Sequence, residues 1–301
     1  MLHKSVLLKE TIDGLEFKEG DVYLDATLGA GGHMEEVWRR MSNKVTLVGI
    51  DADEVSVEIA SERLELCGAK PKLMVLNFRN IDKAPALLQI KNPTKILFDL
   101  GWRKDQFETP EGEVGRGFSF QKDEPLLMTF KKNVGEEDTT AYDVVNHWSE
   151  ENLADVIYGF GEEKFSRRIA KAIVAKRNVA PIKTSLELSE IIKSAVPIFY
   201  RFGRIHPATK TFQAIRIAVN DELQALNEGL EKSFQILEKQ GRLAVISFHS
   251  LEDRIVKNFF RKKAEEEKAE IITKKPIIPS EDEEAENPRS RSAKLRIIKK
   301  L

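Results

Sequence analysis

The sequence has little of what secreted and membrane proteins depend on. It contains one cysteine, Cys67, so no disulfide can form within the chain, and a reducing, cytoplasmic setting is expected. No uncharged apolar run approaches the roughly 18 residues that a membrane-spanning helix needs. Charged residues at positions 4, 9 and 10 interrupt the N-terminal segment and argue against a signal peptide. These absences exclude the secreted, disulfide-rich and membrane classes.

Repeats and metal-ligand clusters are also missing. The 301 residues contain no internal repeat, and no set of His, Cys and acidic residues resembles a metal cluster, so no metal is expected. What is present is a globular composition, with 41% hydrophobic and 32% charged residues. A chain of this length is expected to form about two domains, or one domain with an insertion.

Charge is distributed unevenly, although the net charge is −1. Residues 162–216 contain twelve Lys or Arg against four Asp or Glu, and residues 287–301 contain six basic residues and no acid. Five acids lie just before this tail, in residues 280–286. Basic segments are typical of contact with a polyanion, and they are also typical of solvated helix faces. Charge alone leaves both interpretations open.

The first hundred residues alternate between strand and helix patterns. Short apolar runs predict strands at 22–25, 45–50, 72–78 and 95–100. Helical patterns lie between them, and the one at 53–66 places Val55, Ile59 and Leu66 near one face. This alternation predicts an α/β fold with a parallel doubly wound sheet. Its ligand is expected at the carboxyl ends of the strands.

The alternation stops near residue 101, where a long glycine- and charge-rich stretch begins. From about 138 to 237 the pattern is helical, and its clearest helix starts at a capping box at Thr184 and extends to Phe199. Strand character returns at 241–248 and at 293–298, with a charged helix between them. The simplest organisation is an α/β sheet that is interrupted by a helical insertion and then completed.

The first two predicted strands end in residues suited to a ligand. Gly29, Gly31 and Gly32 follow the first strand, and their spacing differs from the G-x-G-x-x-G loop that binds pyrophosphate. Such a turn can also serve backbone geometry alone. Asp51 ends the second strand, where an acid accepts hydrogen bonds from ribose hydroxyls. Asp53 is the competing acid and is expected to cap the following helix.

The third and fourth strands continue the pattern. Phe78 follows the third strand, where its ring is suited either to flanking an adenine or to core packing. Asp99 ends the fourth strand, three residues before Trp102. Residues suited to a ligand at the ends of four successive strands are not expected to arise by chance, so together they favour a ligand crevice.

These strand ends resemble those of Rossmann-like methyltransferases that use S-adenosylmethionine, and longer motifs narrow the resemblance. The motifs are 25–33 (DATLGAGGH), 116–120 (RGFSF), 161–170 (GEEKFSRRIA), 206–217 (HPATKTFQAIRI), 245–257 (VISFHSLEDRIVK) and 287–296 (NPRSRSAKLR). They resemble signatures of the RsmH/MraW family, whose members methylate N4 of a cytosine in the decoding centre of 16S rRNA.

The resemblance implies a class I methyltransferase sheet with an inserted all-helical domain. The methyltransferase domain is expected to be discontinuous, at 1–104 and 206–301, and the insertion at 105–205 is expected to recognise RNA. S-adenosylmethionine is the implied cofactor, and 16S rRNA in the small ribosomal subunit is the implied partner, in the cytoplasm and away from membranes. Neither pattern nor resemblance indicates an oligomeric state.

The resemblance also assigns site residues. The implied cofactor contacts are Gly31, Gly32, His33, Asp51, Phe78, Asp99 and Gln106, of which Gln106 rests on the resemblance alone. The basic segments supply the expected RNA-binding residues, which are Arg167, Arg168, Lys171, Lys210, Arg289 and Arg291. Lys176 and Arg177 belong to the same basic helix as the first three.

Asp99 and Trp102 are the expected catalytic residues. Amino-directed methyltransferases place an acid and an aromatic at this spacing, where the acid meets the target amine and the aromatic stacks on the base. An anchor for a buried loop is an equally good interpretation of Trp102. His33 is expected to contact the cofactor, and His249 is expected to be a satisfied turn residue.

The chain departs from the family pattern in two places. Trp102–Lys104 and Leu127–Lys131 replace the family's usual residues in loops expected to line the substrate side. An alternative function is therefore a catalytically weakened relative that binds S-adenosylmethionine and assists ribosome assembly. A DNA amino-methyltransferase or a nicotinamide oxidoreductase agrees less well with the motifs, and the oxidoreductase would need the missing G-x-G-x-x-G loop.

Overall fold

The computed structural model describes residues 4–101, 115–131, 134–135, 137–203 and 205–301. The chain divides into two compact units: unit 1 is Met1–Arg103 with Leu223–Leu301, and unit 2 is Lys104–Glu222. The sequence placed the second boundary at residue 206. The division falls later because α10 (Thr209–Asn220) packs on α6 (Glu150–Gly161) within unit 2.

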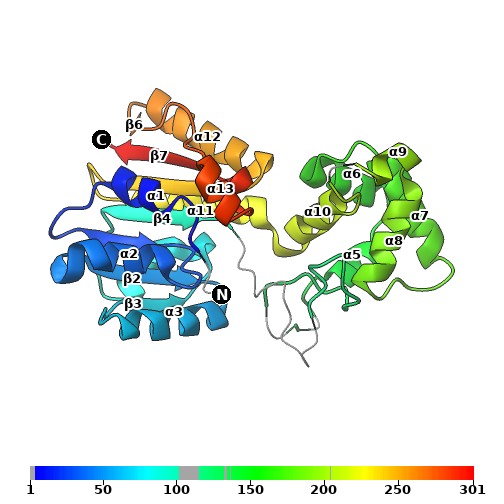
Figure 1. Cartoon of the computed structure of the whole chain (residues 1–301), viewed down its shortest axis with the longest axis horizontal. Coiled ribbons are helices and arrows are strands. Elements are labelled where there is room, and N and C mark those ends of the chain that lie inside the picture. The colour runs from blue at the N-terminus through cyan, green and yellow to red at the C-terminus, as the bar shows by residue number, and fades with distance from the viewer. Residues whose placement is uncertain (1–3, 102–114, 132–133, 136, 204) are drawn as a thin grey trace. The chain divides into compact units, whose positions relative to one another are not determined.

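Unit 1 is built on a seven-stranded sheet in the order β3-β2-β1-β4-β5-β7-β6 (Figure 1). The strands are β1 (Val22–Asp25), β2 (Thr46–Asp51), β3 (Lys72–Val75), β4 (Lys95–Asp99), β5 (Arg242–Ser247), β6 (Ala269–Ile271) and β7 (Lys294–Lys300). Neighbours among β1 to β5 pair in parallel, whereas β7 runs antiparallel to both β5 and β6. The α/β prediction is confirmed, but β3 ends three residues early and β6 was not predicted.

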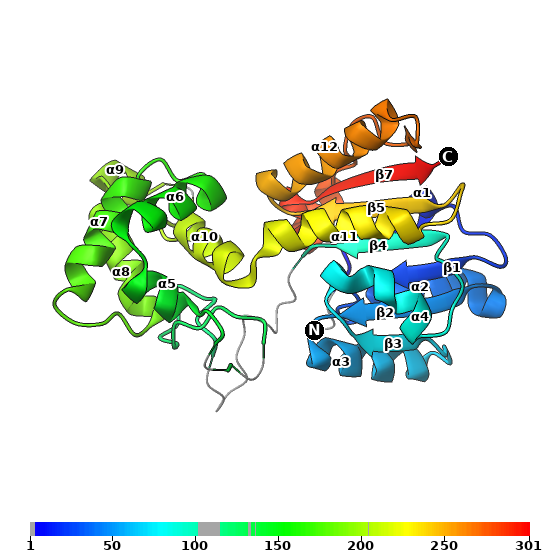
Figure 2. The same cartoon turned by 180° about the vertical axis from the view of Figure 1, so that it is seen from behind.

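Helices cover both faces of this sheet, as a largely parallel sheet requires. One face packs against α11 (Glu222–Ile236) and α12 (Ser250–Glu265), and the other against α1 (Leu8–Leu15), α2 (Gly32–Met41) and α3 (Glu54–Leu66) (Figures 1 and 2). The shorter elements of unit 1 are η1 (Ser42–Lys44), η2 (Phe78–Lys83), α4 (Ala84–Leu87), α13 (Glu281–Glu286) and η4 (Ser290–Ser292).

The predicted apolar face of α3 is wrong. The pattern places Val55, Ile59 and Leu66 near one face, yet Leu66 is 89% and Ile59 37% exposed, so this is not the face that packs on the sheet. The buried residues are instead Ser56, Ala60 and Leu64. A side chain at Gly31 would place its Cβ only 3.2 Å from the Cβ of Ala60, so the helix approaches the glycine turn through small residues. The helix therefore buries the small side chain of Ala60 against the turn and leaves the larger Leu66 exposed.

Unit 2, in its described part, is built from helices. They are α5 (Ala141–His147), α6, α7 (Ser166–Arg177), α8 (Ser185–Ala195), α9 (Ile198–Arg201) and α10. The capping box at Thr184 is confirmed. The helix that it starts does not reach Phe199, because Pro197 follows its end and α9 begins separately. Among the helices that the structure describes, none has the length and apolar content needed to cross a membrane.

Candidate active site

The glycine turn after β1 is held by the acid that ends β2. Gly29 and Gly31 both have positive φ, +53° and +75°, which glycine adopts without strain. The backbone N–H groups of Gly29 and Asp53 donate to the Asp51 carboxylate, at 2.8 Å and 2.9 Å. The side chain of Asp53 caps α3 by accepting from the N–H of Val55, as predicted. Asp51 therefore organises the turn as well as standing at the expected ribose position.

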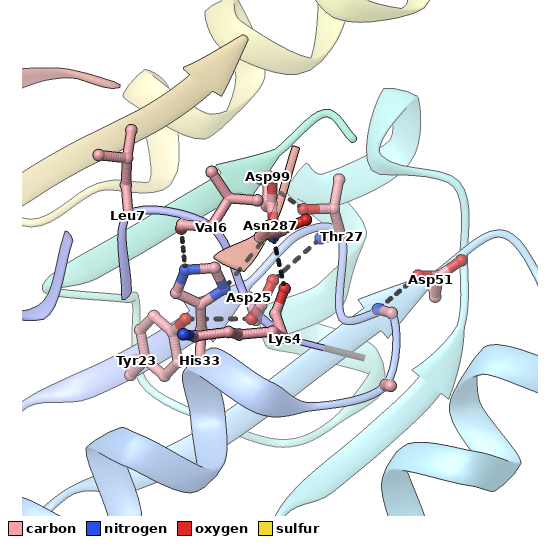
Figure 3. Close-up of polar contacts among 12 residues, drawn as sticks. Lys4, Val6, Leu7, Tyr23, Asp25, Thr27, His33, Asp51, Asp99 and Asn287 are labelled. Carbon is pink, nitrogen blue, oxygen red and sulfur yellow. Dashed lines mark hydrogen bonds and ion pairs between the residues drawn. The ribbon is translucent and has the colours of Figure 1, made fainter. Parts of the chain in front are cut away.

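The start of α2 is covered by the N-terminal segment 4–7. A Cβ at Gly32 would lie 2.1 Å from the Oγ of Ser5, so this approach requires glycine. His33 is 4% exposed, and its Nε2 donates to the carbonyl oxygen of Val6 over 3.2 Å (Figure 3). That bond places the proton on Nε2 in the neutral ring and directs Nδ1 toward the site.

The acidic helix α13 anchors segment 4–7. Glu283 accepts from the N–H of Leu7 at 2.8 Å, and Glu286 forms an ion pair with Lys4. Asn287 donates to the carbonyl oxygen of Lys4 at 3.4 Å (Figure 3). Leu7 has a left-handed φ of 50°, a strained conformation for a bulky residue, and its side chain is fully buried. The acidic run near residue 283 thus has a structural use that the sequence analysis did not assign.

Two carboxyl groups meet behind the glycine turn. The Tyr23 hydroxyl donates to Asp25 at 3.0 Å, and the N–H of Thr27 donates to the same carboxylate at 3.2 Å. The N–H of Asp99 donates to the Thr27 hydroxyl at 2.6 Å. His33 Nδ1 lies 3.7 Å from Asp99 Oδ2 (Figure 3). The ends of β1 and β4 and the start of α2 therefore form one polar cluster.

Burial makes these two acids hard to ionise. Burial raises the pKa of Asp25 to about 7, and the nearby negative charge of Asp51 adds to the rise. Burial likewise raises the pKa of Asp99 to about 7, and the nearby negative charge of Asp25 adds to the rise. Among the described residues, Asp99 Oδ1 is buried without a hydrogen-bond partner. A buried acceptor of this kind favours a ligand that brings a cation or an N–H donor.

Residues after β5, the strand next to β4, also lie at the carboxyl end of the sheet. The Phe248 ring lies so close to Gly101 that a Cβ there would be 2.6 Å from it. His249 is the N-cap of α12, with a capping box formed with Glu252, so the turn position is as predicted; its buried Nε2 has no hydrogen-bond partner among the described residues, so the residue is not fully satisfied. Phe78 is half-buried at the start of η2, with its ring 5.5 Å from that of Phe98. This contact fits core packing, and a role beside adenine stays a prediction.

The predicted RNA-binding residues differ in their surroundings. Arg167, Arg168 and Lys171 are exposed on α7, Arg289 is exposed at the N-cap of η4, and Arg291 is exposed within η4. Lys210 instead donates to the carbonyl oxygen of Glu162. Arg177 donates to the carbonyl oxygens of Val145 and Trp148 at 2.7 Å and 2.6 Å, so it ties α7 to the end of α5. Trp102 and Gln106 lie outside the described residues.

Sequence reasoning missed the partners of the site rather than its main residues. Tyr23 and Asp25 are two apart on one strand, so their side chains point to the same face, and this signal was readable. The opposite charges of Lys4 and the acidic run 281–286 were also readable. The contact between Val6 and His33 has no local signal, because it depends on a backbone carbonyl.

The residues present fit S-adenosylmethionine. The Asp51 carboxylate stands at the end of β2, where an acid can accept hydrogen bonds from ribose hydroxyls. The unpartnered oxygen of Asp99 suits the positively charged end of the cofactor. This sheet order, the glycine turn and the acids that end β2 and β4 define a Rossmann-like methyltransferase that depends on S-adenosylmethionine.

The chain belongs to the MraW methylase family, whose model matches residues 1–301. It is similar to the ribosomal RNA small subunit methyltransferase H of Sulfurihydrogenibium sp. (strain YO3AOP1), with 46% identity over 299 residues and 99% of both chains. The protein of the same name from Clostridium botulinum (strain Kyoto / Type A2) is 47% identical over 316 residues, again covering 99% of both chains.

Proposed function

We propose that this protein transfers a methyl group from S-adenosylmethionine to N4 of a cytosine in the decoding centre of 16S rRNA, within the small ribosomal subunit in the cytoplasm. The observation that carries the proposal is the partly buried acid Asp99 at the carboxyl end of β4, whose buried Oδ1 lacks a partner among the described residues. The relatives named as small subunit rRNA methyltransferases support the choice of substrate.

The reaction depends more on how the protein positions the target amine and the methyl group than on chemical activation of either. The cofactor supplies a methyl group on a sulfonium, which is already a good leaving group. The exocyclic amine of cytosine is a weak nucleophile, because its lone pair is delocalised into the ring. The chain must therefore hold the amine in line with the methyl group and exclude competing water.

Asp99 is suited to accept a hydrogen bond from the target amine. The amine becomes more acidic as positive charge develops on it, so an adjacent acceptor stabilises the transition state. Because its pKa is raised to about 7 by burial and by Asp25, the carboxyl group can both take up and release a proton near neutral pH. His33 Nδ1 lies 3.7 Å from the same carboxylate, close enough to contribute to the polarity around it.

Trp102 is proposed to stack on the target base after the base leaves the RNA stack. Trp102→Ala is expected to slow methyl transfer, since stacking of a base on an aromatic ring contributes roughly 1–3 kcal/mol. Cofactor affinity, measured by calorimetry, should stay near that of the parent. Normal turnover per folded molecule together with a lower melting temperature would make Trp102 a loop anchor instead.

The second candidate function is a cofactor-binding assembly factor with weak turnover, motivated by the departures at Trp102–Lys104 and Leu127–Lys131. Within the second of these segments, Met128 and Thr129 are buried, and the carbonyl oxygen of Met128 accepts from Asn220 at 2.7 Å. This segment holds its place through buried side chains and its backbone, so its altered side chains are compatible with the fold.

Two measurements separate the candidates. Mass spectrometry of small-subunit rRNA from cells with and without the protein should show loss of one N4-methylated cytosine when the protein is absent. Labelled S-adenosylmethionine with immature small subunits should transfer label to that position in vitro. Binding of cofactor and subunits without transfer would support the assembly factor, and transfer to DNA but not to RNA would refute the proposed substrate.

A further inference from the structure

Unit 2 exposes aromatic side chains in one short segment. Among the described phenylalanines, only Phe199 and Phe202 are classed as exposed, at 71% and 84%. Ile198 and Ile205 nearby are 70% and 58% exposed. Phe199 and Phe202 are three residues apart around α9, so their rings lie on the same side of this turn. Large apolar groups gathered in one exposed place are typical of a binding surface.

The backbone beneath these rings is held firmly. The Tyr200 hydroxyl donates to Glu163 at 2.6 Å, and Glu163 is fully buried and also accepts from the N–H of Phe165. Arg201 donates to the carbonyl oxygens of Val196 and Ser194 at the end of α8. Because Tyr200 and Arg201 are both held by hydrogen bonds, the exposed position of Phe199 belongs to an ordered turn.

Basic side chains lie beside the rings. The Phe165 ring is 6.5 Å from the Phe199 ring, and Lys164 Nζ lies 5.2 Å from the Phe165 centroid. The helix α7 starts directly after Phe165, with exposed Arg167 and Arg168 in its first turn. We call Phe165, Phe199 and Phe202 the aromatic edge. Three cations thus follow or flank Phe165, whose ring neighbours Phe199, and rings beside cations are found where single-stranded nucleic acids bind.

We propose that the aromatic edge binds an unpaired segment of the RNA substrate, with bases stacked on Phe199 and Phe202 and phosphates of the same strand paired with Lys164, Arg167 and Arg168. The inference rests on the proposed function, because it takes the ligand to be RNA. It adds a docking surface in unit 2 for nucleotides of the substrate strand.

Charge favours RNA over a second copy of the chain. Residues 162–216 carry twelve basic and four acidic residues, and Glu163 is buried beneath the edge. A symmetric contact between two copies would place like charges opposite each other, which is repulsive. A strand of phosphates instead neutralises them.

The test uses the full-length protein and a fluorescein-labelled, unpaired RNA oligonucleotide of about 12 nucleotides, a typical span for such surfaces. Fluorescence anisotropy measures its affinity at several salt concentrations. Phe199→Ala with Phe202→Ala is expected to weaken binding by about tenfold per ring. The salt dependence should stay that of the parent, because the phosphate contacts remain. The matching RNA duplex should lose little affinity.

Three further variants make the result specific. Trp at both positions should restore binding, since its ring also stacks, whereas Leu at both positions should not. Arg167→Gln with Arg168→Gln should weaken binding and flatten the salt dependence by up to about 0.7–0.9 per lost phosphate contact. Val179→Ala removes a side chain that is 83% exposed just beyond the opposite end of α7 and should change nothing.

Several results would overturn the inference. One is a double Ala or double Leu variant that binds the oligonucleotide as tightly as the parent. Another is loss of self-association in sedimentation with RNA affinity unchanged, which would make the aromatic edge a contact between copies. Ring-dependent RNA binding by a protein that methylates no rRNA would support this inference and refute the proposed function.

Discussion

At the scale of single residues, Asp51 combines two tasks. Its carboxylate accepts from Gly29 and Asp53, so it shapes the glycine turn, and it stands where ribose hydroxyls are expected. Asp51→Ala should weaken S-adenosylmethionine binding by on the order of 1–3 kcal/mol, because buried donors lose a charged acceptor. Isothermal titration calorimetry measures this loss.

Asp53→Ala is the matched control for that experiment. Asp53 caps α3 and has no expected contact with the cofactor, so its removal should lower stability by about 1 kcal/mol and leave affinity unchanged. Equal affinities for the Asp51 variant and the parent, with both folded, would remove Asp51 from the site.

The pair of Asp25 and Asp99 predicts a pH dependence. Their pKa values are raised from 3.8 to about 7 by burial. Between about pH 4 and pH 7 the unfolded chain releases protons that the folded protein keeps, so stability falls as pH rises through this window and then levels off. Asp25→Asn should therefore be more stable than the parent above pH 7, by up to about 4 kcal/mol, and nearly equal to it near pH 4.

Urea unfolding at a series of pH values checks this expectation. The difference between variant and parent isolates the pair from all other titrating groups. Asn keeps an oxygen that accepts from the N–H of Thr27, and its amide NH2 can donate to the Tyr23 hydroxyl oxygen, so the packing is largely preserved. A stability difference that does not change between pH 4 and pH 8 would mean that Asp25 ionises normally.

At the scale of elements, α13 and segment 4–7 form a unit that the strand-and-helix pattern did not reveal. Glu283 holds the N–H of Leu7, and the adjacent Val6 carbonyl orients His33. Glu283→Ala should increase hydrogen exchange in segment 4–7 and weaken cofactor binding by about 1 kcal/mol, the value of one hydrogen bond to a buried donor.

Glu283→Gln keeps an acceptor oxygen and serves as the matched variant. It should retain most of the protection and of the affinity. If the Ala variant shows faster exchange in segment 4–7 with parental cofactor affinity, the segment covers the glycine turn without supporting the site.

The α7 helix shows how the surroundings of a charge decide its role. Arg167, Arg168, Lys171 and Arg177 all belong to the basic pattern of one helix. The first three are exposed, whereas the guanidinium of Arg177 donates hydrogen bonds to two backbone carbonyl groups of unit 2. The sequence could not separate them, because the carbonyl groups come from residues about thirty positions earlier in the chain.

At the scale of the whole molecule, the net charge of −1 gives no sign of the proposed RNA contact, because the basic residues are concentrated in residues 162–216. Replacing Arg167, Arg168 and Lys171 with Gln should lower affinity for small-subunit particles and flatten its salt dependence by up to about 0.7–0.9 per lost phosphate contact. Filter binding at several salt concentrations measures both quantities. S-adenosylmethionine binding should not change, because these residues belong to unit 2.

A matched triple variant tests whether any loss of positive charge would do the same. Lys44, Lys70 and Lys91 are exposed in unit 1, and their replacement with Gln removes the same charge. This control should keep the parent's salt dependence. If both triple variants behave like the parent, the basic face of α7 is a solvated helix face.

Much of the fold and of the site was predictable from local patterns. The ends of β1, β2 and β4, the glycine turn, the capping roles of Thr184 and Asp53, and a helical insertion all have local causes. The predicted face of α3 failed because apolar periodicity ignores the close approach of Ala60 to Gly31. The extension of α8 to Phe199 failed because periodicity was followed across Pro197.

The sequence by itself determined which residues stand at the carboxyl edge of the sheet, since strand ends and turns depend on neighbouring residues. The tertiary structure decided what those residues can do. It buried Asp25 beside Asp99, which raises both pKa values, and it brought Val6 to His33. Protonation and hydrogen bonding depend on burial and on partners far away in the chain, and no local pattern encodes either.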